Sequence, residues 1–361
     1  NCNFPTLRFP EFSGEWKKDI IGNVISVKSE KYNPHSNRTE FICVELESIS
    51  QGTGELLETF NSTEQKSIKN KFSPGTVLFG KLRPYLRKFY LPYFEGVCSS
   101  EIWVMRSNKI EPAFLYSFIQ TPYFISLANQ SSGSKMPRAD WGLIETSKIA
   151  YPPNSAERVK IGKFLKLIDE RIATQNKIIA HLESLIKGLT NQLLIPNSNW
   201  QPTTIGQVLT INPGKDYKHL KEGNIPVYGT GGYMLSVNDY LYDGESVCIG
   251  RKGTINKPIF LTGKFWTIDT LFYTSNFNSL LPRFGYYLFK TIDWLKYNEA
   301  SGVPSLSKVS IEKIHISLPS LAIQNSICRL LDSIYDKLAL EESVLNNHQT
   351  QKAFILQQMF I

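Results

Sequence analysis

Four short segments of this chain combine Lys or Arg with Gly, Ser, Pro or Tyr, and these residue types suit contacts to nucleic acid. Lys and Arg contact phosphate oxygens, and the Arg guanidinium also matches the hydrogen-bonding edge of guanine. The segments are KLRPYLRK (81–88), SGSKMPR (132–138), NPGKDYK (212–218) and GRKGT (250–254). The predicted DNA-binding residues are Lys81, Arg83, Arg87, Lys88, Ser132, Lys135, Arg138, Lys215, Lys218, Tyr228, Arg251, Lys252, Thr254 and Ser305.

Each segment taken alone is equally well explained by a solvated basic surface. The net charge of +8, from 40 Lys and Arg against 32 Asp and Glu, fits nucleic-acid binding but is shared by many other proteins. The recurrence of these segments along the chain distinguishes better between a DNA-binding surface and a solvated one.

The residue patterns typical of catalytic and metal sites are missing. There is no G-x-x-x-x-G-K-[ST] phosphate loop, and YGTGGY (228–233) reads as a tight turn. YPPN (151–154) resembles the Pro-Pro motif of amino-methyltransferases, but it directly precedes a predicted helix and reads as the end of a domain. The five His and five Cys residues show no ligand spacing. We therefore expect no catalytic residue, no metal ion and no bound cofactor in this chain.

The chain repeats itself once. WKKDIIGNV (16–24) returns as WQPTTIGQV (200–208), and polar Ser-Gly segments occur at 130–153 and 300–319. An amphipathic run follows each polar segment, at 157–172 and at 323–338. The segments 80–84 and 250–254 occupy corresponding places, as do 131–135 and 301–305. Two similar domains with different loop sequences are what a protein needs to bind two different half-sites of DNA.

The two amphipathic runs predict long helices with a coiled-coil seam, because their apolar residues recur every three and four positions. Asn154 and Glu157 predict a capping box at the start of the first helix, and Pro196 predicts its end. Each helix has one good apolar stripe, so we expect the two to pack antiparallel; packing only on their own domains is the alternative. The predicted seam residues are Ile161, Leu165, Ile168, Ile172, Gln175, Ile179, Leu182, Ile327, Leu331, Ile334, Leu338, Glu341 and Leu345.

Polar residues interrupt this seam. With full overlap, Ile161 would meet Met359, and Gln175 would lie within about one turn of Glu341. Such residues often fix the register of a coiled coil, although both side chains could instead point to solvent. His348 and Lys352 occupy further seam positions of the second helix.

The remaining sequence predicts strands and loops, with strands at 76–82, 97–105, 246–252 and 265–273 and helices at 111–120 and 282–295. We expect an α+β fold, in which two mixed α/β domains are separated by two long antiparallel helices. The predicted division is a first domain at 1–154, a first helix at 155–196, a second domain at 197–320 and a second helix at 321–361.

Taken together, these features resemble the specificity subunits of type I restriction–modification enzymes. The resemblance rests on LRFPEFSGEW (7–16), IGRKGT (249–254) with FWTIDT (265–270), SGVPSLS (301–307), and the helices that follow YPP and LP. It covers essentially residues 7–360, and the joint order of these motifs is specific although each is weak alone.

The resemblance implies that two target-recognition domains each read one half of a split double-stranded DNA site. It implies that the helices set the spacing of the halves and dock two modification subunits. S-adenosylmethionine, ATP and Mg are then expected on the modification and restriction subunits, so that the assembled complex, not this chain, is a DNA adenine methyltransferase and ATP-dependent endonuclease. Two alternatives stay open: a methyltransferase or nuclease with an unrecognised site, and a coiled-coil DNA-binding scaffold.

No stretch of the sequence is apolar enough over about 18 residues to span a membrane, and the opening residues lack the pattern of a signal peptide. Scattered cysteines without paired spacing are typical of a reducing compartment. We therefore expect a cytoplasmic protein with no membrane contact.

Overall fold

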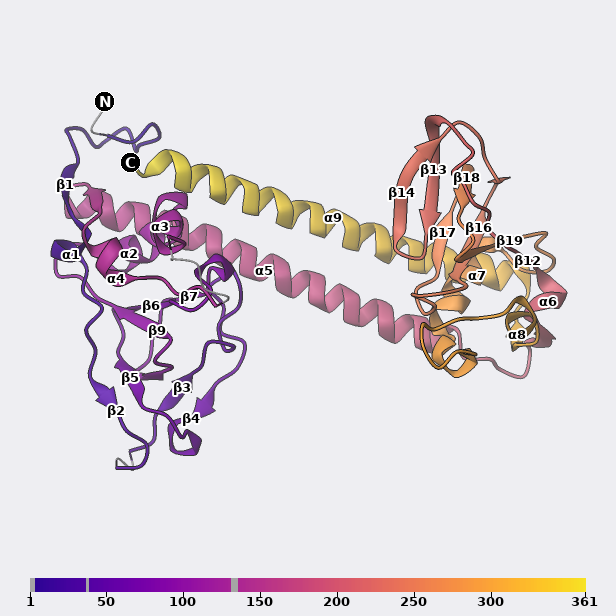
Figure 1. Cartoon of the computed structure of the whole chain (residues 1–361), viewed down its shortest axis with the longest axis horizontal. Coiled ribbons are helices and arrows are strands. Elements are labelled where there is room, and N and C mark those ends of the chain that lie inside the picture. The colour runs from indigo at the N-terminus through magenta and orange to yellow at the C-terminus, as the bar shows by residue number, and fades with distance from the viewer. Residues whose placement is uncertain (1–3, 37–38, 131–135) are drawn as a thin grey trace. The chain divides into compact units, whose positions relative to one another are not determined.

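The computed structural model describes residues 4–36, 39–130 and 136–361, which fall into two compact units. The first unit comprises residues 1–179 and 341–361, and the second comprises residues 180–340. Two uninterrupted helices, α5 (Ser155–Leu193) and α9 (Leu321–Met359), contribute to both units (Figure 1). Among the described residues, no helix combines the length and the apolar character that crossing a membrane requires.

The first unit contains a five-stranded sheet of order β2-β5-β8-β3-β4, a three-stranded sheet of order β7-β6-β9, and the pair β1-β10. All pairings are antiparallel except that of β3 with β8. In Figure 1, α2 lies between α5 and the three-stranded sheet, and Gly162 of α5 faces Ala113 of α2. The bounds are β1 (Lys17–Ile20), α1 (Ile21–Val24), β2 (Lys31–Tyr32), β3 (Ile42–Val44), β4 (Phe60–Asn61), η1 (Ser62–Glu64), β5 (Lys69–Phe72), β6 (Val77–Gly80), η2 (Pro84–Leu86), β7 (Phe89–Tyr90), β8 (Gly96–Cys98), β9 (Ile102–Met105), α2 (Pro112–Phe118), α3 (Pro122–Ala128), α4 (Trp141–Glu145) and β10 (Lys148–Tyr151).

The second unit contains sheets of order β12-β19-β16-β17 and β14-β13-β18-β15, and the pair β11-β20. The strands β13 and β18 are parallel, and the other pairings are antiparallel. The bounds are β11 (Gln201–Thr204), α6 (Ile205–Val208), β12 (Thr210–Asn212), β13 (Glu222–Gly229), β14 (Gly232–Val237), β15 (Tyr242–Asp243), β16 (Ser246–Gly250), β17 (Ile259–Leu261), β18 (Lys264–Thr267), β19 (Leu271–Ser275), α7 (Pro282–Thr291), η3 (Trp294–Tyr297), α8 (Lys308–Glu312) and β20 (His315–Leu318).

The internal repeat is present in the structure. In each half, a strand and a one-turn helix open the repeat (β1-α1 and β11-α6), and the opening strand pairs with the last strand before the long helix (β10 and β20). The three-stranded arrangement β7-β6-β9 returns as β17-β16-β19. The predicted α+β class with two long helices is confirmed.

The repeated Ile-Gly of the opening motifs has a packing reason. A Cβ on Gly22 would lie 3.0 Å from the Cβ of Glu145 in α4, and a Cβ on Gly206 would lie 2.8 Å from the Cβ of Glu312 in α8. A glycine therefore lets α1 approach α4, and α6 approach α8, in matching positions.

Two of the predicted strands are wrong in detail. The run 97–105 forms β8 and β9, and the run 265–273 falls on β18 and β19. A turn interrupts each run, because the Ile102 amide donates to the Ser99 carbonyl at 3.0 Å and the Leu271 amide donates to the Ile268 carbonyl at 2.9 Å. The polar residues of the two turns, Ser99 to Glu101 and Asp269 to Thr270, also suit the outward-facing positions of a strand, so periodicity did not reveal either turn.

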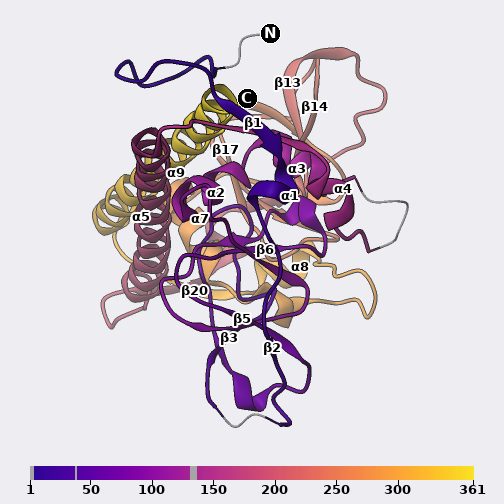
Figure 2. The same ribbon diagram turned by 90° about the vertical axis from the view of Figure 1, so that its left-hand side faces the viewer.

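The long helices pack antiparallel within each unit, as predicted. In the first unit, Ile161 and Leu165 of α5 share a core with Leu356 and Met359 of α9, and Figure 2 shows the two helices side by side. In the second unit, Leu193 of α5 packs with the core that contains residues 327 and 331 of α9. None of the thirteen predicted seam residues is exposed.

Polar seam residues bind each other, as the overlap argument predicted. Gln175 is 7% exposed, and its Nε2 donates to the Glu341 carbonyl at 3.0 Å and to the Glu341 carboxylate. The buried Lys352 ammonium pairs with the Asp169 carboxylate and donates to the Gln120 side chain. The alternative in which Gln175 points to solvent is wrong.

The predicted capping box at the start of α5 is only half formed. The Asn154 side chain accepts from the Ala156 amide at 2.9 Å, which is the expected cap. Glu157 instead turns inward, where it accepts hydrogen bonds from Arg8 at 2.7 and 2.8 Å and from the Trp16 indole at 3.3 Å. The Glu157 carboxylate therefore pairs with Arg8 in place of the Asn154 backbone amide that a capping box would give it.

A side chain on each long helix holds the start of a shorter helix in its own repeat. Arg158 of α5 donates to the Pro152 carbonyl at 2.8 Å and pairs with Glu111, the N-cap of α2. In the matching place, Gln324 of α9 donates to the Pro319 carbonyl at 2.9 Å and accepts from the amide of Leu281, the N-cap of α7, at 2.9 Å. Two different residue types thus perform the same positioning in the two repeats.

Candidate nucleic-acid interface

The segment after β6 in the first unit is held by backbone hydrogen bonds on both sides. The Lys81 amide donates to the Glu101 carbonyl at 2.9 Å, and the Lys81 carbonyl accepts from the Ala139 amide at 2.8 Å. The Arg83 amide donates to the Pro137 carbonyl at 2.8 Å. The loop after β6, the turn between β8 and β9, and the end of the polar Ser-Gly segment therefore form one frame.

The second unit repeats this frame bond for bond. The Arg251 amide donates to the Thr270 carbonyl, the Arg251 carbonyl accepts from the Leu306 amide, and the Gly253 amide donates to the Pro304 carbonyl, each at 2.8 Å. Lys81 thus corresponds to Arg251. The turns that the sequence prediction missed are the parts that supply the Glu101 and Thr270 carbonyls.

The loop of the first unit carries backbone strain. Arg83 and Arg87 have φ of 51° and 52°, a left-handed region that costs a residue with a Cβ roughly 1 kcal/mol or more. The residue of the second unit that matches Arg83 is Gly253, whose φ of 97° is ordinary for glycine. Strain of this kind clusters at binding sites, and here it holds two arginines of a predicted DNA-binding segment.

In the first unit, the frame brings Lys81, Arg83 and Arg138 together, since residues 82 and 138 form an isolated β-bridge. Arg83 is exposed, whereas Arg138 pairs with Glu101, with 3.0 Å between its Nε and the carboxylate. A DNA contact by Arg138 would therefore compete with this carboxylate.

Two other predicted residues of this segment turn toward the protein. The Arg87 guanidinium donates to the Gln120 carbonyl at 3.1 Å, and the Lys88 ammonium donates to the Leu46 carbonyl at 2.7 Å. Burial lowers the pKa of both side chains from their usual values. A contact from either to DNA would require the loss of these bonds.

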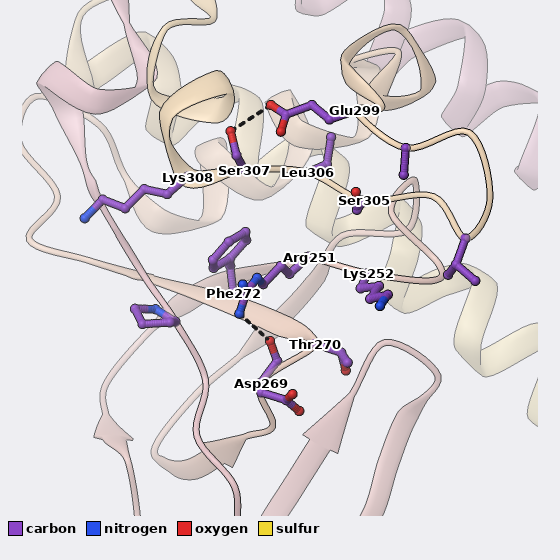
Figure 3. A pocket seen from close by; sticks show the side chains of 13 residues that line it. Arg251, Lys252, Asp269, Thr270, Phe272, Glu299, Ser305, Leu306, Ser307 and Lys308 are labelled. Atoms are coloured by element: carbon purple, nitrogen blue, oxygen red, sulfur yellow. Dashed lines mark hydrogen bonds between the residues drawn. The ribbon is translucent and has the colours of Figure 1, made fainter.

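In the second unit, Arg251, Lys252 and Ser305 line a cleft of about 760 Å³ (Figure 3). Lys252 and Ser305 form the β-bridge that corresponds to the one between residues 82 and 138. Two carboxylates, Asp269 and Glu299, line the same cleft. Hydrogen bonds from Ser310 and Ser307 lower the pKa of Glu299, so its carboxylate is charged at neutral pH.

The other predicted residues of the second unit do not line this cleft. The loop that carries the exposed Lys215 and Lys218 runs beside β18, because the Lys215 amide donates to the Thr267 carbonyl at 2.8 Å. The half-buried Tyr228 precedes the β13–β14 turn, and a Cβ on Gly253 would lie 3.5 Å from Thr230 of that turn. Half-buried Thr254 ends the same loop as Arg251.

Ser132 and Lys135 lie outside the described residues, so their place stays a prediction. The residues that sequence reasoning missed are acidic or neutral: Glu101, Asp269, Thr270 and Glu299. Basic segments do not point to these residues. The FWTIDT motif (265–270) does contain Asp269 and Thr270. Among the described residues, no group of His, Cys, Asp and Glu has the arrangement of a metal site.

A family model described as the type I restriction modification DNA specificity domain matches this chain twice, at residues 14–184 and 197–348. The chain is 23% identical over 194 residues to the specificity subunit of the type I restriction enzyme EcoDI from Escherichia coli. That match covers 53% of this chain and 43% of the relative, and the other curated relatives compared are likewise matched over less than half their length.

Solved structures show the same fold over nearly the whole chain. The S subunit of a type I restriction–modification system from Mycoplasma genitalium has a TM-score of 0.66 at 16% identity, with 99% of both chains covered. A chain from a study of complex assembly and conformational transition in a type I system has a TM-score of 0.59 at 17% identity, covering 95% of this chain and 96% of that one.

Proposed function

Because the chain belongs to the family of type I restriction–modification DNA specificity domains, and carries two copies of that domain, we propose that it is the specificity subunit of such a complex. Each repeat reads one half of a bipartite site in double-stranded DNA. The chain itself performs no catalysis in this proposal.

The observation that carries the proposal is the duplicated frame. Identical backbone hydrogen bonds hold the loops after β6 and β16, but the side chains that these loops present differ, with Lys81 in one repeat and Arg251 in the other. Two equivalent supports with different side chains suit two half-sites of different sequence, since base edges are read by side-chain donors and acceptors.

The partners follow from the same proposal. The pair α5 and α9 docks two modification subunits and sets the unread spacing between the half-sites, and restriction subunits complete the complex. S-adenosylmethionine, ATP and Mg are bound by those partners. The assembled complex then methylates adenine and cleaves DNA with ATP. We also propose a cytoplasmic location, which the four described cysteines support because they are buried and free of disulfides.

The test is methylation by the assembled complex. The chain expressed with modification subunits should methylate adenines within one bipartite motif, as measured by sequencing of methylated bases in host DNA. The isolated chain should bind duplex DNA in a gel-shift assay and transfer no methyl group. Methyl transfer or cleavage by the highly purified chain alone would favour the unrecognised-enzyme alternative, and absence of DNA binding in the complex would overturn the proposal.

A further inference from the structure

The cleft of the second unit has a charge pattern that suits a base edge better than a phosphate. Arg251, Lys252 and Lys308 supply positive charge, but Asp269 and Glu299 supply two carboxylates within the same lining. A phosphate would be repelled by those carboxylates. The edges of a base pair present both donors and acceptors, so they can satisfy a mixed lining.

Arg251 is held in place before any DNA arrives. Its backbone is fixed by hydrogen bonds on both sides, and its guanidinium lies over the Phe272 ring with 5.9 Å from Cζ to the ring centroid. Its Nη1 also lies 3.5 Å from the Asp269 carbonyl, which Figure 3 shows as the dashed contact below it. Among the described residues it forms no ion pair, so its remaining donors are available for a ligand.

The first repeat lacks this group at the same position. Lys81 replaces it, and an ammonium is a point charge that cannot present the paired donors of a guanidinium. Two arginines lie near Lys81. Arg138 is paired with Glu101, and the exposed Arg83 corresponds to Gly253 and not to Arg251. At this position, a guanidinium that can donate two parallel hydrogen bonds to guanine O6 and N7 is therefore present in the second repeat and absent from the first.

We propose that Arg251 reads a guanine in the half-site bound by the second repeat, through paired hydrogen bonds to its O6 and N7. This inference rests on the proposed function, because it assigns one base contact within a bipartite site. The second half-site then contains at least one G·C pair whose guanine faces the cleft.

Arg251→Lys tests this in the complex with modification subunits, because it keeps the charge and removes the fork. The methylated motif of the wild-type complex is compared with that of the variant. We expect one guanine of one half-site to become degenerate, with a loss of discrimination of roughly 5- to 150-fold at that base. The other half-site and the spacing should stay unchanged.

Lys257→Ala is the matched control, because Lys257 is exposed in the loop that follows Thr254 and does not line the cleft. It should leave the motif unchanged. Equal weakening of all sites by Arg251→Lys would show a phosphate contact, and an unchanged motif would show no base contact; either result overturns the inference. A wild-type complex that yields no bipartite motif would instead overturn the proposed function.

A binding measurement covers the case in which the variant complex methylates too little DNA to define a motif. Duplexes carrying 7-deazaguanine at each second-half guanine in turn lack the N7 acceptor. The wild-type complex should bind one of these duplexes more weakly, and the variant should show no such penalty. Equal sensitivity of both proteins at every guanine would contradict the assignment.

Discussion

Lys352 is a buried cation in a helix seam, and its surroundings show how it is tolerated. It pairs with Asp169, donates to Gln120, and lies 5.8 Å from the centroid of the Phe89 ring. Burial raises the pKa of Asp169, and the attraction of Lys352 opposes that shift. The pair therefore bears a desolvation cost that its mutual contact, the hydrogen bonds with Gln120 and the Phe89 ring offset.

Removing one partner of this pair should be strongly destabilising. Asp169→Ala leaves the Lys352 ammonium buried without its counter-charge, and we expect a loss of about 3–5 kcal/mol in the free energy of unfolding, measured by urea denaturation. The double variant Asp169→Leu with Lys352→Met should lose much less. A double variant as unstable as the single one would show that the charges themselves stabilise the seam.

Asp19 makes the stability of the first unit depend on pH in the acidic range. Hydrogen bonds from Lys109, Asn23 and the Ile20 amide lower its pKa from 3.8 to about 2. A carboxylate with a lowered folded pKa stabilises the fold above its unfolded pKa, and this contribution is lost as the pH falls through about 2.

Asp19→Asn should therefore be less stable than the wild type at neutral pH, and the difference should shrink between about pH 4 and pH 2. Thermal melting across this range measures it. Glu183→Gln, at an exposed position of α5, is the control and should give a curve parallel to the wild type. A difference that persists at pH 2 would exclude titration of Asp19 as its cause.

At the scale of elements, two glycines within α5 have opposite roles. A Cβ on Gly162 would lie 2.7 Å from the Cβ of Ala113 in α2, whereas a Cβ on Gly188 would meet nothing within 4 Å. Gly162 therefore permits the close packing of α5 on α2, and Gly188 only adds freedom to the unfolded chain.

Gly162→Ala should destabilise the protein by roughly 1–3 kcal/mol through overpacking. Gly188→Ala should stabilise it by roughly 0.5–1 kcal/mol through helix propensity. Urea denaturation of the two variants against the wild type provides the comparison, and a stabilising Gly162→Ala would mean that α2 moves away at little cost.

The long helices and their antiparallel seam could be predicted from the sequence, because a heptad pattern sustained over so many turns is typical of long helices that pack on each other. The polar contact between Gln175 and Glu341 followed from the same register. The turns before Ile102 and Leu271 were not predicted, because their polar residues also suit the solvent-facing positions of an alternating strand. The inward direction of Arg87 and Lys88 was also hidden, since their partners are backbone carbonyls that carry no sequence signal.

At the scale of the whole molecule, both long helices contribute to both units. Lengthening both helices by the same amount therefore tests whether they set the unread gap between the half-sites. Seven residues inserted after Ile179 in α5, and seven before Glu341 in α9, preserve the heptad pattern and add roughly 10 Å. At about 34 Å per turn of DNA, the unread gap of the methylated motif should lengthen by roughly three base pairs, with both half-sites unchanged.

Seven Gly and Ser residues inserted after Pro196, between α5 and β11, form the control and should leave the gap unchanged. Sequencing of methylated bases reads both results. An active complex whose gap stays constant with lengthened helices would show that the helices do not measure the spacing.

The first unit closes its core with residues from the far end of the chain, and this has a consequence for synthesis on the ribosome. Leu356 and Met359 pack with Ile161 and Leu165, and the Leu7 amide donates to the Gln358 carbonyl at 3.0 Å. The second unit is continuous in sequence from residue 180 to 340, so all of it leaves the ribosome before residues 341–361, which the first unit needs. The usual order, in which the N-terminal part of a nascent chain finishes first, is therefore reversed. Until residues 341–361 emerge, the apolar residues at the start of α5 lack their partners Leu356 and Met359 and stay exposed on the nascent chain.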